Sequence, residues 1–249
     1  FFFSVFLWAD TATQGRAYEY FLKGEYALLQ KNYPQAESEF SKALSLAPDS
    51  PTILQSLIEL KSYQGEYADA IKYAEKIIEI EPSNKEIGFE LFQLYIQEGN
   101  LDDAHELLDR LLEYHPGDID LLYSQANIQY SNQHWPNLIM TYYSIYLSDT
   151  DNRDFLIKIY EIGLATGNES IVLEILKEIR TENETPLVLE LLVELLSGMS
   201  EFTEAIFYTH KLMEIDKYTD QRSISLGELY LLNQQFNYVI STLDPIYQS

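Results

Sequence analysis

Very few residues of this chain have the type and spacing that catalysis requires. The 249 residues include no cysteine, which removes thiolate nucleophiles, Cys-ligated zinc sites and iron–sulfur clusters together. No Gly-x-Ser-x-Gly sequence marks a nucleophile elbow. The histidines form no His-x-x-x-His pair and stand beside no Ser or Glu at a catalytic spacing; the four are His105, His115, His134 and His210. A Ser–His–Asp triad, whose members meet only in the fold, is the catalytic arrangement that the sequence leaves open.

Loops that bind phosphate or calcium are also missing from the sequence pattern. Asp149-Thr150-Asp151-Asn152 is acidic, but it lacks the spaced ligands and the closing Glu of an EF-hand loop, which favours a solvated turn. The glycines stand singly rather than in a Gly-x-Gly-x-x-Gly or Walker pattern; examples are Gly24, Gly65, Gly88, Gly99 and Gly117. The sequence therefore predicts no enzyme activity, no cofactor and no metal site.

The charge of the chain excludes another class of function. It carries 16 Lys and Arg against 40 Asp and Glu, a formal net charge of −24 at pH 7, and it has no basic cluster. Because nucleic-acid affinity depends on basic side chains that displace counterions, we expect no nucleic-acid partner. With 46% hydrophobic and 14% aromatic residues the chain can build a core, which argues against disorder. No apolar run reaches the roughly 18 residues that a membrane-spanning helix needs.

The elements that must position the remaining side chains follow from a repeat of 34 residues. Within a repeat, apolar residues recur at helical intervals on both sides of a short turn such as Gly65-Glu66, where Gly can end a helix in the left-handed conformation. A Pro then stops the second helix, because it lacks a hydrogen-bond donor and collides with the preceding turn. Two helices per repeat are therefore predicted. The repeat separates Ala36, Ala70 and Ala104, and equally Pro48, Pro82 and Pro116.

This pattern resembles the tetratricopeptide repeat (TPR). The first repeat carries the residue types of that family at Tyr20, Gly24, Ala36, Phe40, Ala43 and Pro48. Repeats four to six match less well, with Leu138 and Val172 where Ala is usual. The resemblance implies an all-α fold, an α-solenoid in which antiparallel helix pairs stack into a right-handed superhelix. It predicts about seven repeats, at residues 17–50, 51–84, 85–118, 119–152, 153–185, 186–219 and 220–249, the last of them truncated.

Pentatricopeptide repeats share the helix-pair design and are the competing interpretation. They read RNA one base per repeat and need a basic surface along the groove. The formal charge of −24 and the lack of a basic run decide against them.

By the TPR resemblance, the fifth and ninth residues of each repeat line the concave groove, which is the usual partner site of that family. Five of the seven fifth places hold large apolar residues, and the set is Phe21, Gln55, Phe89, Tyr123, Ile157, Glu190 and Ile224. Five of the seven ninth places hold carboxylates, and the set is Glu25, Glu59, Gln93, Asn127, Glu161, Glu194 and Glu228. Only Asn127 fits the Lys, Arg and Asn pattern with which some TPR domains bind the C-terminal carboxylate of a partner.

These residues predict a non-catalytic scaffold or adaptor whose groove binds an apolar or basic segment of a partner protein. Aromatic anchors would supply affinity, and carboxylates would supply orientation and on-rate. A chain with 40 acidic residues also places carboxylates on any solvent-exposed face, which is the simpler explanation of the same pattern. Two other functions fit the sequence: the repeat region of a larger enzyme or envelope-assembly factor whose active domain lies elsewhere, and a self-associating structural module.

The two ends of the sequence suggest further expectations. Residues 1–9 are apolar, lack an initial Met and end at Ala9 before a polar stretch, like the remnant of a secretory signal peptide. Residues 1–16 are therefore predicted to be a signal remnant plus leader, with export to a bacterial periplasm or envelope; an apolar leading helix in a cytoplasmic protein is the alternative. Residues 243–249 stop inside the second helix of the seventh repeat without a polar cap, which suggests a fragment of a longer protein with further repeats or another domain; self-association through that end is the alternative.

Overall fold

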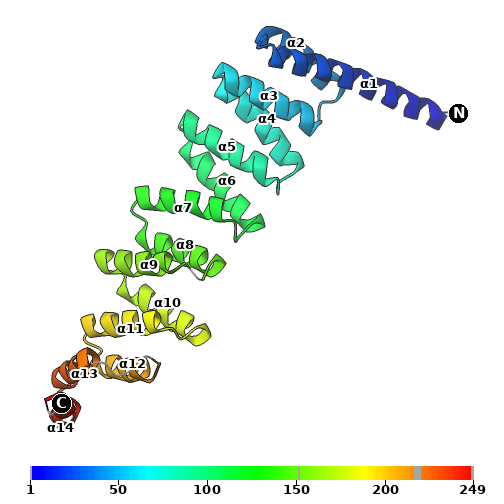
Figure 1. Ribbon diagram of the computed structural model, residues 1–249. Coiled ribbons are helices and arrows are strands. Elements are labelled where there is room, and N and C mark those ends of the chain that lie inside the picture. The colour runs from blue at the N-terminus through cyan, green and yellow to red at the C-terminus, as the bar shows by residue number, and fades with distance from the viewer. Residues whose placement is uncertain (1, 151, 216–219, 248–249) are drawn as a thin grey trace. The chain divides into compact units, whose positions relative to one another are not determined.

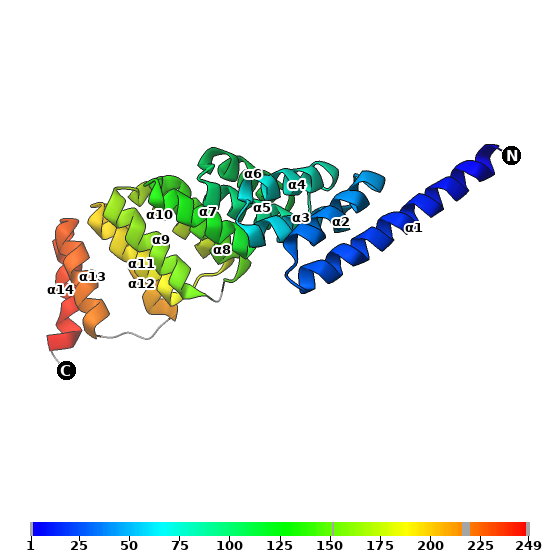
Figure 2. The same cartoon turned by 90° about the horizontal axis from the view of Figure 1, so that it is seen from above.

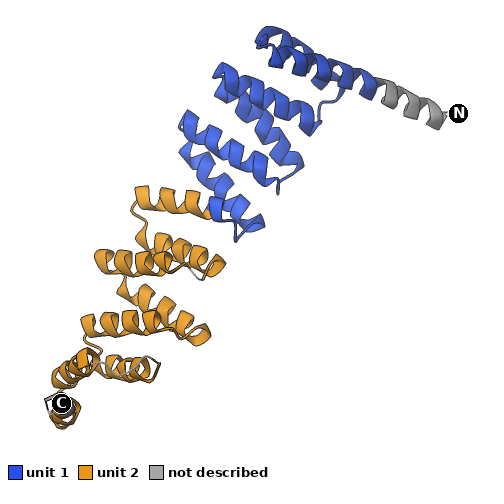
Figure 3. Ribbon diagram, in the orientation of Figure 1, with its two compact units in different colours: residues 1–121 blue, residues 122–249 orange. Residues whose placement is uncertain are grey.

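The computed structural model of the chain describes residues 2–150, 152–215 and 220–247, with the side chains of these residues except 2–12, 245 and 247. In this part of the chain all regular secondary structure is helical. The chain divides into two compact units, unit 1 at residues 1–121 and unit 2 at residues 122–249 (Figure 3). Each unit is a solenoid of stacked helix pairs, which confirms the predicted all-α repeat fold.

Unit 1 stacks three helix pairs, and within each pair the two helices run antiparallel (Figures 1 and 2). Its helices are α1 (Phe2–Leu29), α2 (Tyr33–Leu46), α3 (Pro51–Gln64), α4 (Tyr67–Ile80), α5 (Lys85–Glu98) and α6 (Leu101–Tyr114). Helix α7 (Ile119–Ser131) begins at the end of unit 1 and continues into unit 2. The second helix of each pair in unit 1 ends two residues before a Pro, as the spacing of Pro48, Pro82 and Pro116 predicts.

Unit 2 repeats the same plan with helices of 12 to 14 residues. They are α8 (Trp135–Ser148), α9 (Arg153–Thr166), α10 (Glu169–Glu182), α11 (Pro186–Gly198), α12 (Phe202–Ile215), α13 (Asp220–Leu232) and α14 (Phe236–Tyr247). The described residues thus form fourteen helices, in agreement with about seven repeats.

A residue in the left-handed conformation closes the turn inside each described pair. Gly65, Gly99 and Gly167 have φ angles of 75°, 80° and 72°, a region that glycine enters without a steric penalty. Gln133 takes the same place between α7 and α8 with a φ of 57°. Lys31, Ser200 and Gln234 take this place in the remaining pairs, so the turn is a property of the repeat and does not require glycine.

The core forms where the two helices of a pair meet at small residues. Ala36, Ala70 and Ala104 are completely buried, which lets the second helix approach the first. The weaker repeats exchange the sizes of the facing residues instead. Val172 of α10 occupies the place of Ala and is completely buried, while Gly163 of α9 faces it and has no side chain. A Cβ atom at Gly163 would collide with Cγ2 of Val172.

Replacing Gly163 by Ala should destabilise the protein by about 1–2 kcal/mol, because overpacking against Val172 outweighs the better helix propensity of Ala. In the double variant Gly163→Ala/Val172→Ala the new methyl group fills space that the shorter side chain leaves. The free energy of unfolding lost should then be smaller than the sum of the single losses by about 1 kcal/mol. Urea unfolding of the three variants measures this, and additive losses would contradict it. Gly198→Ala is the control, since a Cβ there meets nothing within 4 Å.

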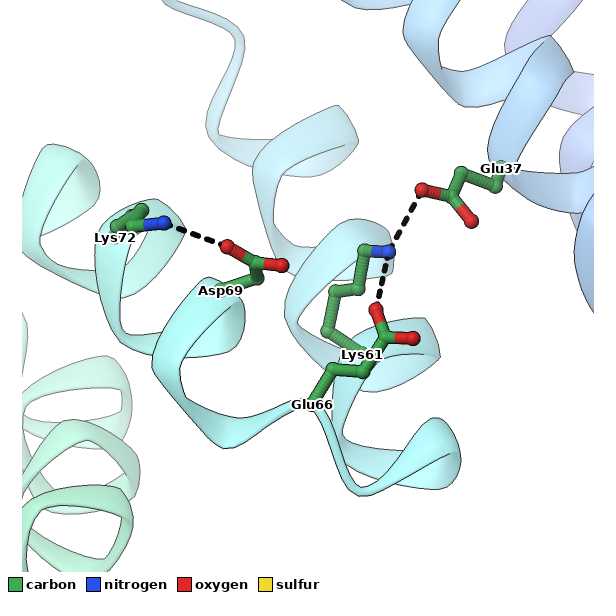
Figure 4. A network of polar contacts seen from close by, with 5 residues as sticks. All are labelled: Glu37, Lys61, Glu66, Asp69 and Lys72. Carbon is green, nitrogen blue, oxygen red and sulfur yellow. Dashed lines mark hydrogen bonds and ion pairs between the residues drawn. The ribbon is translucent and has the colours of Figure 1, made fainter. Parts of the chain in front are cut away.

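One buried charge sits inside unit 1. Lys61 of α3 has a side chain only 6% exposed, and its Nζ lies 2.7 Å from Oε1 of Glu37 on α2 and 2.6 Å from Oε2 of Glu66 (Figure 4). Burial disfavours the ammonium, but the hydrogen bonds from the two carboxylates prevail and raise the pKa of Lys61 to about 12. The charge of Lys61 is thus neutralised where α2, α3 and the start of α4 meet.

The predicted leader, residues 1–16, lies mostly among the residues whose side chains are not described, and export stays a prediction. Among the described residues, no helix combines the length and the apolar character that a membrane crossing requires.

Candidate functional site

The predicted groove residues all lie on the first helix of a pair. In unit 1 they form the unit 1 face, defined as Phe21 and Glu25 of α1, Gln55 and Glu59 of α3, and Phe89 and Gln93 of α5. In unit 2 they form the unit 2 face, defined as Tyr123 and Asn127 of α7, Ile157 and Glu161 of α9, Glu190 and Glu194 of α11, and Ile224 and Glu228 of α13. Nine of these fourteen residues are Glu, Gln or Asn, and the other five are aromatic or Ile. The contacts of each residue decide what it can offer to a partner.

The two aromatic residues of the unit 1 face are partly used by the core. The ring of Phe21 lies 6.1 Å from that of the buried Phe40, and Phe21 packs against the hydrophobic cluster between α1, α2 and α3. Phe89 stacks on Phe92 at 6.0 Å and is half-buried. Each ring therefore offers only part of its surface to a partner.

The carboxylates of the unit 1 face, Glu25 and Glu59, accept hydrogen bonds from hydroxyl groups of α3. Glu25 accepts a hydrogen bond of 2.6 Å from the hydroxyl of Ser56 on α3. Glu59 accepts a hydrogen bond from the hydroxyl of Tyr63 one turn further along α3, which raises the pKa of Tyr63. Glu90 of α5 is half-buried, and burial together with the nearby charge of Glu59 raises its pKa. Repulsion between Glu59 and Glu90 thus disfavours the charged form of Glu90 next to the unit 1 face.

The unit 2 face exposes more apolar surface. Tyr123, Ile157 and Ile224 are 42%, 39% and 38% exposed, although the ring of Tyr123 also contacts that of Phe155 at 5.9 Å. Glu190 pairs with Arg222 of α13 at 3.0 Å, so this fifth-place carboxylate is neutralised. Asn127, Glu161 and Glu228 are exposed.

Glu194 differs from its neighbours because it is tied to a buried tyrosine. Tyr160 of α9 is only 6% exposed, and its hydroxyl donates to Glu194 of α11. Burial, then the charge of Glu194 and this hydrogen bond, raise the pKa of Tyr160 to about 12. The hydroxyl of the buried Tyr160 therefore holds the carboxylate of Glu194 in place.

The ninth-place carboxylates share one electrostatic property. Among the described residues, none of the five forms an ion pair with Lys or Arg; they are Glu25, Glu59, Glu161, Glu194 and Glu228. Some carboxylates on the second helices do form such pairs, as Figure 4 shows for Glu37 with Lys61 and for Asp69 with Lys72 at 2.7 Å. Other exposed carboxylates on second helices, such as Glu79, Glu106 and Glu113, form no described ion pair either, so the ninth places stand out by their common position on first helices and not by the missing partner alone.

A hollow of about 550 Å³ lies beside Glu194 in unit 2. We call it the Tyr160 hollow. Sequence reasoning found only Glu194 of its residues, because the start of α10 and the end of α11 meet only when successive pairs stack. Its walls are Tyr160, Leu164, Glu169, Ser170, Glu194, Leu195, Gly198 and Met199.

The histidines make structural hydrogen bonds where the structure describes a partner. Nε2 of His115 lies 2.8 Å from the carbonyl oxygen of Ser83, and Nε2 of His210 lies 2.8 Å from the hydroxyl of Tyr230. No described hydrogen bond joins a histidine to a serine hydroxyl, which a triad requires. The described part of the chain likewise brings together no three His, Asp or Glu side chains that could hold a metal ion.

Comparison with known proteins agrees with this architecture. Residues 63–128 match the tetratricopeptide repeat family. No curated protein sequence matches the chain. The fold is similar to that of a tetratricopeptide repeat protein from Parabacteroides merdae ATCC 43184, with 16% identity and a TM-score of 0.52 over 92% of this chain and 90% of that one.

A second similar structure is that of Naa15/Naa10 bound to HypK-THB, with 14% identity and a TM-score of 0.51. The alignment covers 92% of this chain but 39% of that one. Identities this low speak for the fold alone. Residues 63–128 thus match the tetratricopeptide repeat family in sequence, and the same helix pairs on both sides of them give the chain the helix-pair solenoid fold of tetratricopeptide repeats.

Proposed function

We propose that the chain is a non-catalytic scaffold that binds a basic or apolar segment of a partner protein on the first-helix faces of its two units. Solenoids of this kind commonly bind partners on the surface that their stacked helices create. The observation that carries the proposal is the position of five carboxylates without a basic partner at the ninth places of first helices, together with exposed apolar side chains such as Tyr123 and Ile157 on the same unit 2 face. A basic segment would supply the missing positive charge.

The strength of such binding follows from exposure. Glu59, Glu161 and Glu228 are exposed, so each contact with a Lys or Arg of the partner contributes only about 0.2–1 kcal/mol. Several contacts along an extended segment add up, and they speed association at low ionic strength. Tyr123 and Ile157 can bury apolar side chains of the same segment, which adds affinity that salt does not screen.

A charge-matched pair of variants tests this proposal. In the face variant, Glu59, Glu161 and Glu228 are each replaced by Gln. In the control variant, the same three charges are removed from exposed carboxylates on second helices, by Glu79→Gln, Glu106→Gln and Glu113→Gln. The probe is a short fluorescent peptide of alternating Lys and Leu, and its affinity is measured by fluorescence anisotropy at low and moderate salt.

We expect the face variant to bind the peptide about tenfold more weakly than the parent, and the control variant to bind it with nearly unchanged affinity. Added salt should reduce the difference. Equal affinities of the two variants would mean that the peptide senses only net charge, and the proposed site would be wrong.

Self-association is a second candidate function, favoured by the surface of α14. Phe236 and Ile240 are 59% and 65% exposed. At the equivalent place in α2, Tyr33 stacks on Tyr63 of the next pair at 6.5 Å, so this surface is covered by a helix elsewhere in the chain. Sedimentation at increasing concentration tests the idea: a mass that rises for the parent but not for Ile240→Glu supports it, and a constant mass for the parent contradicts it.

A further inference from the structure

We infer that the Tyr160 hollow is a socket for one lysine side chain of the partner segment. The inference rests on the proposed function, and it adds a place and a residue type to it. The hollow has a volume of about 550 Å³, which lies within the range of about 300–1,000 Å³ that is typical of ligand pockets.

The walls of the hollow suit the aliphatic stem of a lysine. Leu164, Leu195 and Met199 line it with aliphatic and thioether groups, and Tyr160 adds an aromatic ring. Gly198 has no side chain, and a Cβ at this position meets nothing within 4 Å, so the end of α11 leaves the space open. Lysine commonly buries its methylene groups along such a surface while its ammonium stays at a polar rim.

The polar part of the hollow suits an ammonium group. Glu194 and Glu169 approach it from α11 and α10, and Ser170 adds a hydroxyl. The hydroxyl of Tyr160 donates to Glu194, which fixes the carboxylate but supplies no charge. Two carboxylates on separate helices match the three donors of an ammonium, whereas the planar fork of arginine prefers both oxygens of one carboxylate.

In the described part of unit 2, no Lys or Arg of the chain itself lines the hollow. The bases nearest in sequence are engaged elsewhere. Nζ of Lys158 lies 4.9 Å from the centroid of the Phe155 ring, Lys177 pairs with Glu204 at 2.7 Å, and Arg180 pairs with Glu184 at 3.2 Å. A lysine from outside is therefore the complement that the hollow lacks.

The chain provides its own reporter for the test. Three methionines are present, and Met199 lines the hollow while Met213 is buried elsewhere in unit 2 and Met140 lies on α8. In protein with 13C-labelled methionine methyl groups, the Met199 signal, assigned through Met199→Leu, reports occupancy. The probes are the Lys and Leu peptide and its counterpart with norleucine in place of every Lys, which keeps the stems and removes the charges.

We expect the Lys peptide to shift the Met199 signal and to leave that of Met213 in place. Glu194→Gln, which keeps a hydrogen-bond acceptor for Tyr160, should weaken the Lys peptide about tenfold without weakening the norleucine peptide. Gly198→Leu, which fills the hollow and leaves both carboxylates in the sequence, should abolish the shift. Glu161→Gln, a charge change on α9 outside the lining, should reduce affinity by less than Glu194→Gln does.

Two results would overturn the inference, and they differ in what else they reject. If anisotropy shows that the Lys peptide binds while Met199 does not respond and Gly198→Leu binds equally well, the socket is wrong and the proposed function stands. If the Lys peptide binds neither the parent nor any variant at low salt, the proposed function fails together with the socket.

Discussion

Replacing Phe40 by Ala should lower the free energy of unfolding of unit 1 by about 3–5 kcal/mol, the range typical of a Phe removed from a packed core. Phe40 is completely buried in the cluster that joins α1, α2 and α3. Its ring packs against α1 at Gly24, where a Cβ atom would lie 2.5 Å from the nearest ring atoms. With no side chain at Gly24 to move inward, the cavity has little means of closing.

Hydrogen exchange measured by mass spectrometry shows which helices the Phe40→Ala substitution destabilises. Peptides from α1, α2 and α3 should lose protection, while peptides from α9 to α12 should keep it, because each pair of a solenoid depends mainly on its neighbours. Phe207→Ala is the matched control: this ring is 52% exposed, and its loss should cost less than about 1 kcal/mol. A uniform loss of protection along both units would show that the array unfolds as one block and would contradict the local effect.

The fold was predictable because its signals are local and repeated. Ala36, Ala70 and Ala104 mark the close approach of paired helices, and Pro residues at the same interval mark the helix ends, so each repeat confirms the phase of the next. Contacts between repeats carry no such signal. The exchange of size between Gly163 and Val172 and the burial of Lys61 between Glu37 and Glu66 both depend on which side chains the stacked helices bring face to face.

The helix that carries each candidate residue was predictable, but the contacts of that residue were not. Counting along the repeat places Glu59 and Glu194 on first helices, and the structure agrees. Counting along the repeat does not reveal that Phe21 packs partly against the core, or that Arg222 neutralises Glu190. The Tyr160 hollow was missed because it needs a glycine and a methionine at the end of α11 beside the start of α10, and no spacing within one repeat encodes that meeting.

Buried tyrosines that donate to carboxylates should make the protein lose stability in alkaline solution. Tyr95 donates to Glu75 over 2.7 Å, and Tyr143 and Tyr160 donate to Glu178 and Glu194. Burial and then the neighbouring carboxylates raise the pKa of Tyr143 and Tyr160 to about 12, and burial with Glu75 raises that of Tyr95 as well. The phenols stay neutral in the folded state at a pH where those of the unfolded chain ionise.

The direction of the effect follows from proton binding. Above the ordinary tyrosine pKa of about 10 the unfolded chain holds fewer protons than the folded one, so stability is complete below that pH and falls as the pH rises toward about 12. Each of the three tyrosines should then cost about 1 kcal/mol at about pH 11, or about 3 kcal/mol together. Lys61 acts in the same direction, because its pKa is also raised to about 12 and its contribution disappears as the pH passes through that value.

Urea unfolding at several pH values between about 8 and 11, with tyrosine ionisation followed by its absorbance, measures this loss. The triple variant Tyr95→Phe/Tyr143→Phe/Tyr160→Phe keeps the rings and removes the titrating hydroxyls, so most of the pH dependence should disappear, although stability near neutral pH falls with the lost hydrogen bonds. Tyr114→Phe, at a ring that is 53% exposed, should change neither. A stability that stays flat up to about pH 11 would mean that the tyrosine hydroxyls ionise in the folded chain as they do in water, and that the carboxylates beside them, Glu194 included, are not held as the structure places them.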